Sequence, residues 1–543
     1  MILNTKANTI VLFCLLLALT PSTLHSRLAP RRLYDVVDFG AKGDGTTLNT
    51  KAIQAAIDEC AKTGGIVIFP PGKYLTGSLE LKSNVELRLE TGATVLGSKN
   101  LSDYVARTPL LRSYNDAFLK YSLFYAERQK NIAITGRGTI DGQGSAFKVL
   151  TMQKPDKYKD RPYVIRFVEC GNVAVEDITL TNSASWMQHY LGCDGVTLRG
   201  IHVFNHANLN NDMMDIDGCR NVVISGCTGD TDDDGITLKS TSERATENVS
   251  ITNCIVSSHC NAIKTGTEST GGFRNIVISN IVVRPSSVEK TMSGKPRGIS
   301  GIALTLVDGG MLDGISISHI VMDGPEVPIF IRLGNRGRKY REDAKPPGIG
   351  SLRHVVISDV IARNAGLTGC SITGIEGHPA GDIELNNILI QFSGGVEKRP
   401  EGEVKELEGH YPEATMWGVL PSYGLFVRHI KAIRLRDVVF ARVRDDARPV
   451  IVMDDVAGAE IDHLDAQISP SSEVAIDLEN VRELRLTGSV IRGNAEALFR
   501  LVGEKNGGIT VTDNDLREIM QLCTPGDRQA GLIEGSDNRL RHR

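Results

Sequence analysis

Short β-rich phrases recur along the chain at nearly constant spacing, and this repeat constrains the fold more than any other feature. GVTLRGIHV, NVVISGCTG, NVSITNCIV and NIVISNIVV begin at residues 195, 221, 248 and 275, so the steps are 26, 27 and 27 residues. Each phrase alternates apolar and polar residues between turns rich in Gly, Asn and Asp, which is typical of short strands. One such coil cannot bury its inner face alone, so successive coils must stack. The sequence therefore predicts an all-β fold, a single-stranded parallel β-helix.

Residues at the same phase of successive coils should become vertical neighbours in such a stack. Cys227 and Cys254 share a phase, and we expect them to form a stacked interior pair; a disulfide between them is the less favoured alternative. Asn221, Asn248 and Asn275 share another phase and should form a side-chain ladder along a turn.

The segment NTKAIQAAIDECAKTGG, which begins at residue 49, differs from the strand repeats. Its apolar residues recur at helical spacing, Asn49 or Thr50 could cap its start, and Gly64 and Gly65 would end it. One amphipathic helix before many strands predicts a cap over the open end of the stack. No linker rich in Pro, Gly or Ser follows, so we expect one catalytic domain over residues 27–543.

The repeat steps widen to 39 and 40 residues between 275, 314 and 354. The extra residues predict inserted loops, which commonly build a binding groove on one face of a solenoid.

The first 26 residues have the order of a secretory signal peptide. A positive charge at Lys6 precedes an apolar run over 10–19 and small residues at Ser22 and Ser26. An uncleaved N-terminal anchor is the alternative. No later segment is apolar enough to cross a membrane, so we expect a secreted or periplasmic monomer. The formal net charge of −4 argues against a nucleic-acid partner.

The stretch TDDDGITLKS, which begins at Thr231, places three carboxylates in a row. Asp212 lies 21 residues before Asp233 and His259 lies 26 residues after it, so stacked coils about 4.8 Å apart would bring these side chains and Asp234 to one face. Two carboxyl groups that flank a glycosidic bond can hydrolyse it, one as acid and one as base. Crowding favours this chemistry, because a neighbouring negative charge keeps one carboxyl protonated.

These residues resemble glycoside hydrolase family 28, the polygalacturonases and their relatives. The segment from Asp35 to Ser98 resembles the family's N-terminal cap, YAERQKNIAITGRGTIDGQG resembles the coils that follow, and the likeness extends from about Tyr34 to at least His354. The resemblance implies a right-handed parallel β-helix that hydrolyses a pectic polysaccharide with inversion and needs no metal or other cofactor.

The family's motifs also imply roles for individual residues. The Asn-x-Asp motif falls on Asn210 to Asp212, and the Asp-Asp pair falls on Asp233 and Asp234. Asp233 is then the general acid, while Asp212 and Asp234 hold and deprotonate the attacking water. The motif resemblance adds His259 as a catalytic residue and Asn210 and Lys239 as substrate-binding residues; Asp232 stands where the family has glycine and is given no role.

One family motif is missing. The Arg-x-Lys that grips a galacturonate carboxylate should follow a Gly-Ile pair, but residues 303–305 are Ala, Leu and Thr. Either another cation replaces the grip or the sugar bound there is not a galacturonate. The candidate replacements are Lys264, Arg297, Arg332 and Arg336, the last two in the basic segment FIRLGNRGRKY.

The sequence therefore favours an exported inverting hydrolase of a pectin-like acidic polysaccharide. Three alternatives stay open: a hydrolase of a rhamnogalacturonan or other modified polymer, a non-catalytic β-helical carbohydrate-binding protein, and a calcium-dependent polysaccharide lyase.

Overall fold

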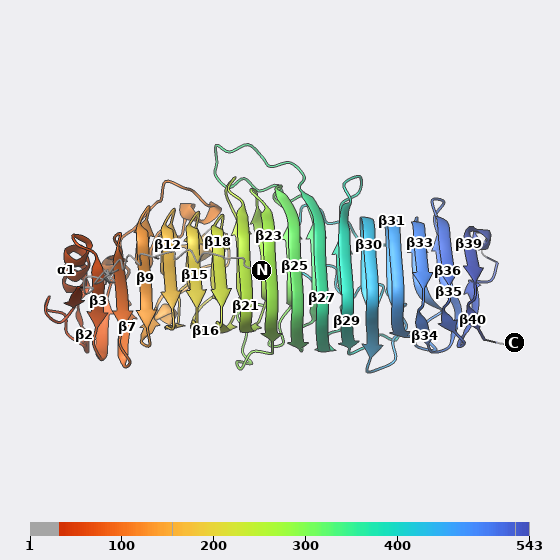
Figure 1. Cartoon of the computed structure of the whole chain (residues 1–543), viewed down its shortest axis with the longest axis horizontal. Coiled ribbons are helices and arrows are strands. Elements are labelled where there is room, and N and C mark those ends of the chain that lie inside the picture. The colour runs from red at the N-terminus through yellow and green to blue at the C-terminus, as the bar shows by residue number, and fades with distance from the viewer. Residues whose placement is uncertain (1–31, 155, 527, 542–543) are drawn as a thin grey trace, which may run out of the picture.

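The computed structural model describes residues 32–154, 156–526 and 528–541, which form one long column of stacked coils (Figure 1). Helix α1 (Thr50–Ala61) lies at the N-terminal end of the column and buries Ile53, Ala56, Ile57 and Cys60 against it. Asn49 precedes the helix, although its side chain makes no capping hydrogen bond. The predicted cap is therefore present, whereas the predicted signal peptide lies outside the described residues.

The first coils have three strands each, and each strand pairs in parallel with its equivalent in the next coil. Strands β1 (Leu33–Asp35) and β2 (Asp44–Leu48) begin the column. The first face then contains β3 (Gly65–Phe69), β6 (Val85–Leu89), β9 (Lys130–Gly136), β12 (Gly171–Glu176), β15 (Asp194–Arg199) and β18 (Arg220–Ser225). The second face contains β4 (Gly72–Thr76), β7 (Ala93–Gly97), β10 (Thr139–Asp141), β13 (Thr179–Thr181), β16 (His202–Asn205) and β19 (Thr228–Thr231).

The strands of the third face begin next to the candidate site. It contains β5 (Leu79–Glu80), β8 (Ser122–Glu127), β11 (Tyr163–Val168), β14 (Gln188–Leu191), β17 (Met214–Asp217), β20 (Ile236–Ser240), β22 (Asn261–Ser269), β24 (Ser300–Leu306), β26 (Val327–Leu333) and β28 (Cys370–Thr373). The predicted right-handed parallel β-helix is confirmed.

From the middle of the column onward, the first two faces merge into one long strand per coil. These strands are β21 (Thr246–Ser258), β23 (Phe273–Val283), β25 (Met311–Asp323), β27 (Ser351–Ala365) and β29 (Ala380–Phe392). The stack then continues through β30 (Leu425–Arg442), β31 (Ile451–Gln467), β32 (Val474–Glu479), β33 (Arg482–Thr487), β34 (Val490–Arg492), β35 (Ala495–Val502), β36 (Gly507–Thr512), β37 (Asp515–Leu516), β38 (Ile519–Cys523), β39 (Ile533–Ser536) and β40 (Arg539–Leu540).

Rows of equivalent side chains hold successive coils in register. Val222, Val249 and Ile276 are stacked partners, all buried, and the row continues along the column. Asn248 donates to Asn221 over 3.2 Å and Asn275 donates to Asn248 over 3.1 Å. These asparagines have positive φ, which Asn tolerates better than most residues. The predicted ladder is present.

The predicted cysteine pair lies inside the column. Cys227 and Cys254 are both buried free thiols, so the structure has the stacked pair rather than the disulfide.

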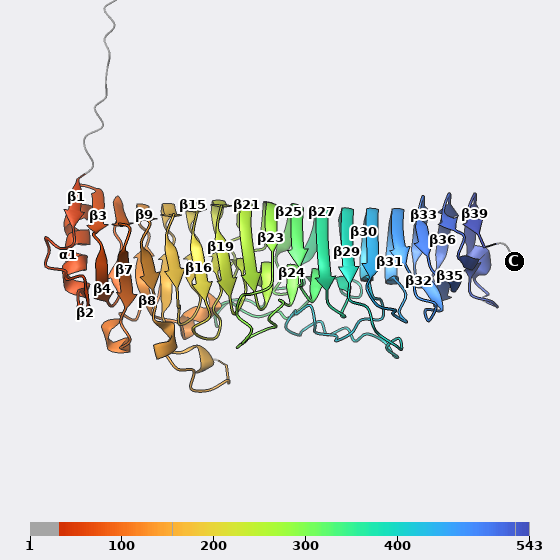
Figure 2. The ribbon, with the colours of Figure 1, turned by 90° about the horizontal axis from the view of Figure 1, so that it is seen from below.

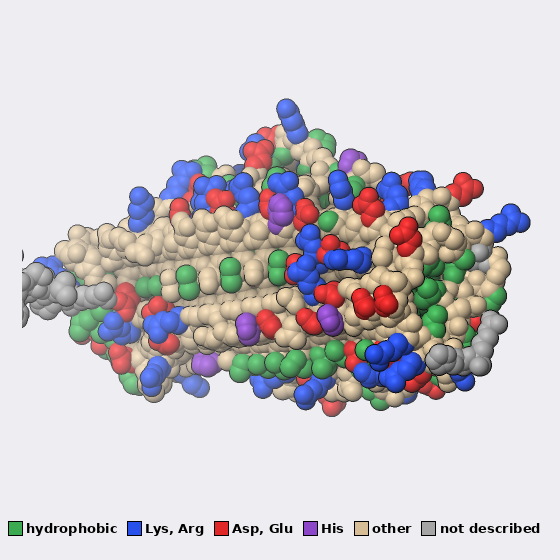
Figure 3. Space-filling view, turned by 45° about the vertical axis from the view of Figure 1, so that its right-hand side comes forward, with side chains coloured by type: hydrophobic (Ala, Val, Ile, Leu, Met, Phe, Trp, Pro, Cys, Tyr) green, Lys and Arg blue, Asp and Glu red, His purple; other side chains and the backbone are tan. Residues whose placement is uncertain are grey.

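The outside of the column also carries rows of apolar residues (Figure 3). One row runs through Ile255, Val282, Val321, Ile361 and Leu389, which are aligned across five coils and partly exposed. Such β-branched and aliphatic neighbours stabilise adjacent strands by cross-strand contact.

The long connections gather on one side of the column, as the view from below shows (Figure 2). Four loops are relevant here: 142–162, 284–299, 334–350 and 393–424. The second and third account for the widened repeat steps. No helix among the described residues has the length and apolarity needed to cross a membrane.

Candidate active site

The three aspartates predicted to act together are held on adjacent coils at the entrance to the third face. Asp212 lies two residues before β17, and Asp234 lies two residues before β20. The backbone N–H of Met213 donates to the carbonyl of Asp234 over 2.9 Å, and Gly235 donates to the carbonyl of Asn261 over 2.8 Å. Asp212 therefore stacks directly on Asp234, with Asp233 beside them.

All three aspartates line one cavity of about 310 Å³. The walls come from the third face, from the connection 98–121 and from all four long loops. The connection contributes Tyr114, Asn115 and Leu119; the loops contribute Lys154, Lys157 and Tyr158, then Ser293, Gly294 and Ile299, then Arg338, and finally Tyr411 and Glu413. Segments almost 300 residues apart in sequence thus close around the carboxylates.

Asp233 is the partly exposed carboxyl of the three. Its Oδ2 lies 3.4 Å from Nδ2 of Asn210, whose Oδ1 accepts a hydrogen bond from Arg161 over 3.0 Å. Burial and the charge of Asp234 raise the pKa of Asp233 to about 6. This carboxyl can thus hold a proton at mildly acidic pH and release it at the cavity.

Asp212 is fully buried at the base of the cavity. Its Oδ1 has no hydrogen-bond partner within the described part of the chain. Burial, and then the charges of Asp215, Asp233 and Asp234, raise its pKa well above the usual value. A buried carboxyl oxygen without a protein partner is suited to hold a water molecule or a sugar hydroxyl.

Asp234 has a full set of partners. Its Oδ2 accepts from Nζ of Lys264 over 2.7 Å, and its Oδ1 accepts from Nδ2 of Asn261 over 2.7 Å. Lys264 also lies 3.2 Å from the hydroxyl of Tyr411. Among the three aspartates, Asp234 is thus the one in a close buried ion pair.

Glu413 brings a fourth carboxyl to the cavity from the 393–424 loop. Burial raises its pKa to about 7, and the charges of Asp234 and Asp233 add to this effect against the opposing charge of Lys264. No sequence pattern predicts this residue at the site, because its loop is far from the aspartates along the chain.

Lys239, which is predicted to bind substrate, lines the cavity. Its Nζ lies 3.4 Å from Glu268 and 3.5 Å from Asp215, and 4.6 Å from the centre of the Trp186 ring. Glu268 also pairs with Arg338. Burial alone would raise the pKa of Glu268, but the three cations Lys239, Arg338 and Arg336 hold it well below its usual range.

His259 does not reach this cavity. Its Nδ1 lies 2.9 Å from Oδ1 of Asp232, and its Nε2 lies 2.8 Å from the carbonyl of Val288. The ring is buried and is not among the residues that line the cavity. Coil spacing placed His259 near the aspartates correctly, but it did not determine which way the side chain points.

Three of the predicted arginines also lie elsewhere. Arg297 donates to the carbonyls of Gly324 and Asn364. Arg332 donates to Thr373 and to the carbonyl of Glu406, and Arg336 is paired with Asp308. None of the three is among the residues that line the cavity.

The strand that should carry the missing Arg-x-Lys provides no cation. Ala303 is buried in a small apolar cluster with Cys260, Ile299, Val327 and Phe330. Thr305 exchanges hydrogen bonds with Thr265 on the preceding coil. Lys264 is the register partner of Ala303, so its ammonium group stands one coil before the first missing residue.

Lys154 and Lys157 bring positive charge to the cavity from the 142–162 loop. Both line the cavity, and neither has a carboxylate partner within 4.0 Å in the described chain. The two ammonium groups lie over the Tyr158 ring, at 6.0 and 5.1 Å from its centre. Burial lowers the pKa of each, and the charge of Arg338 lowers the pKa of Lys154 further. Their loop bears no family motif, so sequence reasoning missed them.

Comparison with known proteins gives consistent results. The family model "Glycosyl hydrolases family 28" matches residues 62–407. A probable polygalacturonase of Vitis vinifera is 29% identical over 67% of this chain and 75% of its own length. An exo-poly-alpha-D-galacturonosidase of Dickeya chrysanthemi is 28% identical over 47% of this chain and 51% of its own length.

Solved structures show the same fold. The exopolygalacturonase of Thermotoga maritima is 25% identical, with a TM-score of 0.57 over 67% of this chain and 88% of its own. The family 28 exopolygalacturonase of Yersinia enterocolitica is 20% identical, with a TM-score of 0.62 over 80% of this chain and 79% of its own.

Proposed function

Because the chain belongs to glycoside hydrolase family 28, we propose that it is an exported, inverting hydrolase that cleaves galacturonate residues from a pectin-like acidic polysaccharide. The observation that carries this proposal is the cavity itself, which holds three neighbouring carboxyl groups together with Lys154 and Lys157, two lysines without a carboxylate partner in the described part of the chain. Carboxyl groups supply the acid and base of glycoside hydrolysis, and lysines supply the charge that an acidic sugar needs.

In the proposed reaction, Asp233 is the general acid. Its raised pKa keeps a proton available, and its partly exposed carboxyl group can reach the glycosidic oxygen. As the bond to the anomeric carbon breaks, the proton passes to the leaving oxygen.

Asp212 and Asp234 hold the attacking water. Asp234, which is ion-paired with Lys264, is the one assigned to accept the proton of the water, because burial favours a proton on Asp212. The unpartnered Oδ1 of Asp212 then orients the water beside it. Water attacks from the face opposite the leaving group, which gives inversion.

Lys154 and Lys157 replace the missing Arg-x-Lys in this proposal. Arg338 is less available, since it pairs with Glu268 and stacks on Tyr114, 3.6 Å from the ring centre. The two lysines lie in the same cavity as Asp233, so a sugar carboxylate could contact them while its glycosidic bond lies beside the acid.

The loops around the cavity favour action at a chain end. Loops from both sides of the catalytic coils form its walls, and such a pocket suits a terminal sugar better than a continuous polymer. Three of the similar proteins are themselves named as exo-acting.

Product analysis tests the proposal. The protein is incubated with polygalacturonate, with pectin and with rhamnogalacturonan, and products are separated by anion-exchange chromatography. We expect galacturonate monomer from polygalacturonate at early times, and no activity from Asp233→Asn. The exposed, isosteric Asp177→Asn serves as the matched control. Activity confined to rhamnogalacturonan would contradict the substrate, unsaturated products would point to a lyase, and full activity in Asp233→Asn would contradict the mechanism.

A further inference from the structure

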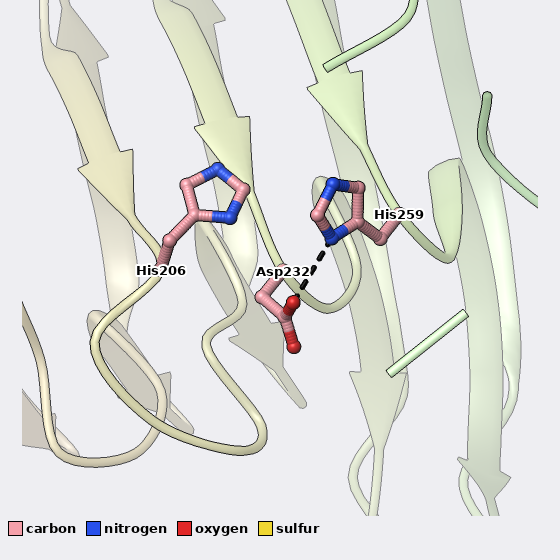
Figure 4. Close-up of side chains that lie close together, drawn as sticks. All are labelled: His206, Asp232 and His259. Atoms are coloured by element: carbon pink, nitrogen blue, oxygen red, sulfur yellow. Dashed lines mark hydrogen bonds and ion pairs between the residues drawn. The ribbon is translucent and has the colours of Figure 1, made fainter. Parts of the chain in front are cut away.

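Asp232, His206 and His259 form a second polar cluster, and none of the three is among the residues that line the cavity (Figure 4). His206 follows β16, and His259 lies between β21 and β22. One ligand-type atom from each of the three residues lies within 4.8 Å of the other two. The two imidazole rings are 5.0 Å apart between centres. The cleavage chemistry proposed above uses none of these side chains.

The outer hydrogen bonds of the two histidines orient both rings in the same way. Nε2 of His206 lies 3.0 Å from Oδ1 of Asp230, and Nε2 of His259 lies 2.8 Å from the carbonyl of Val288. Each Nε2 therefore donates to an acceptor behind it, so each Nδ1 is left on the side of Asp232. Metal-binding histidines are oriented in this way, with the second ring nitrogen donating to a carboxylate or a carbonyl.

His206 has an unused nitrogen in this arrangement. Its side chain is 7% exposed, and its Nδ1 has no hydrogen-bond partner in the described residues. A neutral ring that donates through Nε2 has a free lone pair on Nδ1. Figure 4 shows this edge of the ring turned toward Asp232 and His259. A buried lone pair without a partner is costly in a protein interior, unless a ligand uses it.

We propose that His206, His259 and Asp232 bind a divalent transition-metal ion, with zinc as the favoured metal. Two imidazole nitrogens and one carboxylate oxygen are a common zinc donor set, and a water molecule would complete a tetrahedron. The ligand atoms would move to about 3.3 Å from one another, as tetrahedral zinc requires. Nδ1 of His259 gives up its proton to solvent when zinc takes that position, and the proton count balances.

The site would hold one wall of the catalytic cavity in place. Asp232 accepts hydrogen bonds from the backbone N–H groups of Met292 and Ser293, at 2.8 and 3.0 Å. Both belong to the 284–299 loop, and Ser293 lines the cavity. A metal on Asp232 would thus fix this loop against the column without taking part in bond cleavage, so the inference does not depend on the proposed reaction.

Zinc content and thermal stability test the proposal. The full chain is stripped with a chelator, dialysed against a low concentration of zinc chloride, and analysed by mass spectrometry for metal content. We expect close to one zinc per chain, and a melting temperature several degrees above that of the stripped protein. His206→Ala should lose both effects, while His202→Ala, at an exposed histidine on β16 just before His206, should keep both.

A second variant and a spectroscopic probe guard against misfolding. His206→Gln fills the space with a weaker ligand and should also lose zinc, and cobalt in the wild-type site should give the visible absorption of a tetrahedral ion. Absence of bound zinc in the wild-type protein would overturn the proposal and would leave a buried imidazolium–carboxylate pair. Retention of zinc by a folded His206 variant would overturn it as well.

Discussion

Asp232 and Asp233 are adjacent in the sequence, yet their carboxyl groups lie in opposite surroundings. Asp232 is buried among donors, with His259 and two backbone N–H groups on its oxygens. Asp233 faces the cavity, where its carboxyl group has fewer partners and a raised pKa. The turn thus separates a structural carboxylate from a reactive one by sending consecutive side chains to opposite sides.

Substitution of the two residues should differ most in its effect on the free energy of unfolding. Asp232→Asn leaves His259 without its anion, and loss of one partner of a buried pair costs about 3–5 kcal/mol. Asp233→Asn removes a charge that burial disfavours, so the free energy of unfolding should stay the same or rise. Urea unfolding in chelator-treated buffer measures both. Equal destabilisation by the two variants would contradict the proposed division.

The lysines of the cavity are also expected to bind the negative charge of the substrate. Lys154→Ala together with Lys157→Ala should raise KM for polygalacturonate by about 10- to 100-fold, since a charge-assisted hydrogen bond contributes about 1.5–3 kcal/mol. Lys159→Ala, on the same loop and already paired with Asp156, is the control and should leave KM unchanged. Steady-state kinetics on oligogalacturonides checks this. A decrease in kcat with no change in KM would assign the lysines a different role.

The pH profile sharpens the comparison further. Asp233 must carry a proton to act as acid, and its pKa is about 6, so this pKa should set the alkaline limb of kcat/KM, with the higher rate below it. The value of kcat/KM should then fall about tenfold per pH unit above this pKa. The melting temperature, followed over the same range, separates titration from unfolding. A rate that rises between pH 6 and 8 would not fit Asp233 as the acid.

The smallest effect is expected at Ser293. Asp232 binds the backbone N–H of this residue rather than its side chain. Ser293→Ala should therefore change the equilibrium constant of unfolding and kcat each by less than twofold. Ser293→Pro removes the donor itself and should lower the melting temperature. Equal behaviour of the two variants would show that the backbone contact contributes little.

Much of the fold could be predicted from the sequence, because a sequence repeat of constant length reflects a regular stack of coils. The phase of Asn221, Asn248 and Asn275 gave the ladder, and the spacing of Asp212, Asp233 and Asp234 gave the stacked carboxylates. His259 shows the limit of that reasoning: phase along a coil determines which coils are neighbours, but a turn can direct a side chain to either side.

Residues on the loops were beyond such reasoning altogether. Lys154, Lys157, Tyr411 and Glu413 reach the cavity from irregular segments, where no periodicity relates sequence position to place. For the same reason, the buried and paired arginines of the FIRLGNRGRKY segment could not be distinguished from free ones by composition alone.

The merging of two faces into continuous strands, from β21 to β31, limits where the chain can vary in length. An insertion within β23 or β25 would break its pairing with both neighbouring coils. An insertion at the corners that lead into and out of β24 and β26 only lengthens a loop. Evolution can thus exchange the chemistry of the rim while the stack below stays unchanged, and a laboratory could graft new loops at the same corners to change which sugar is accepted.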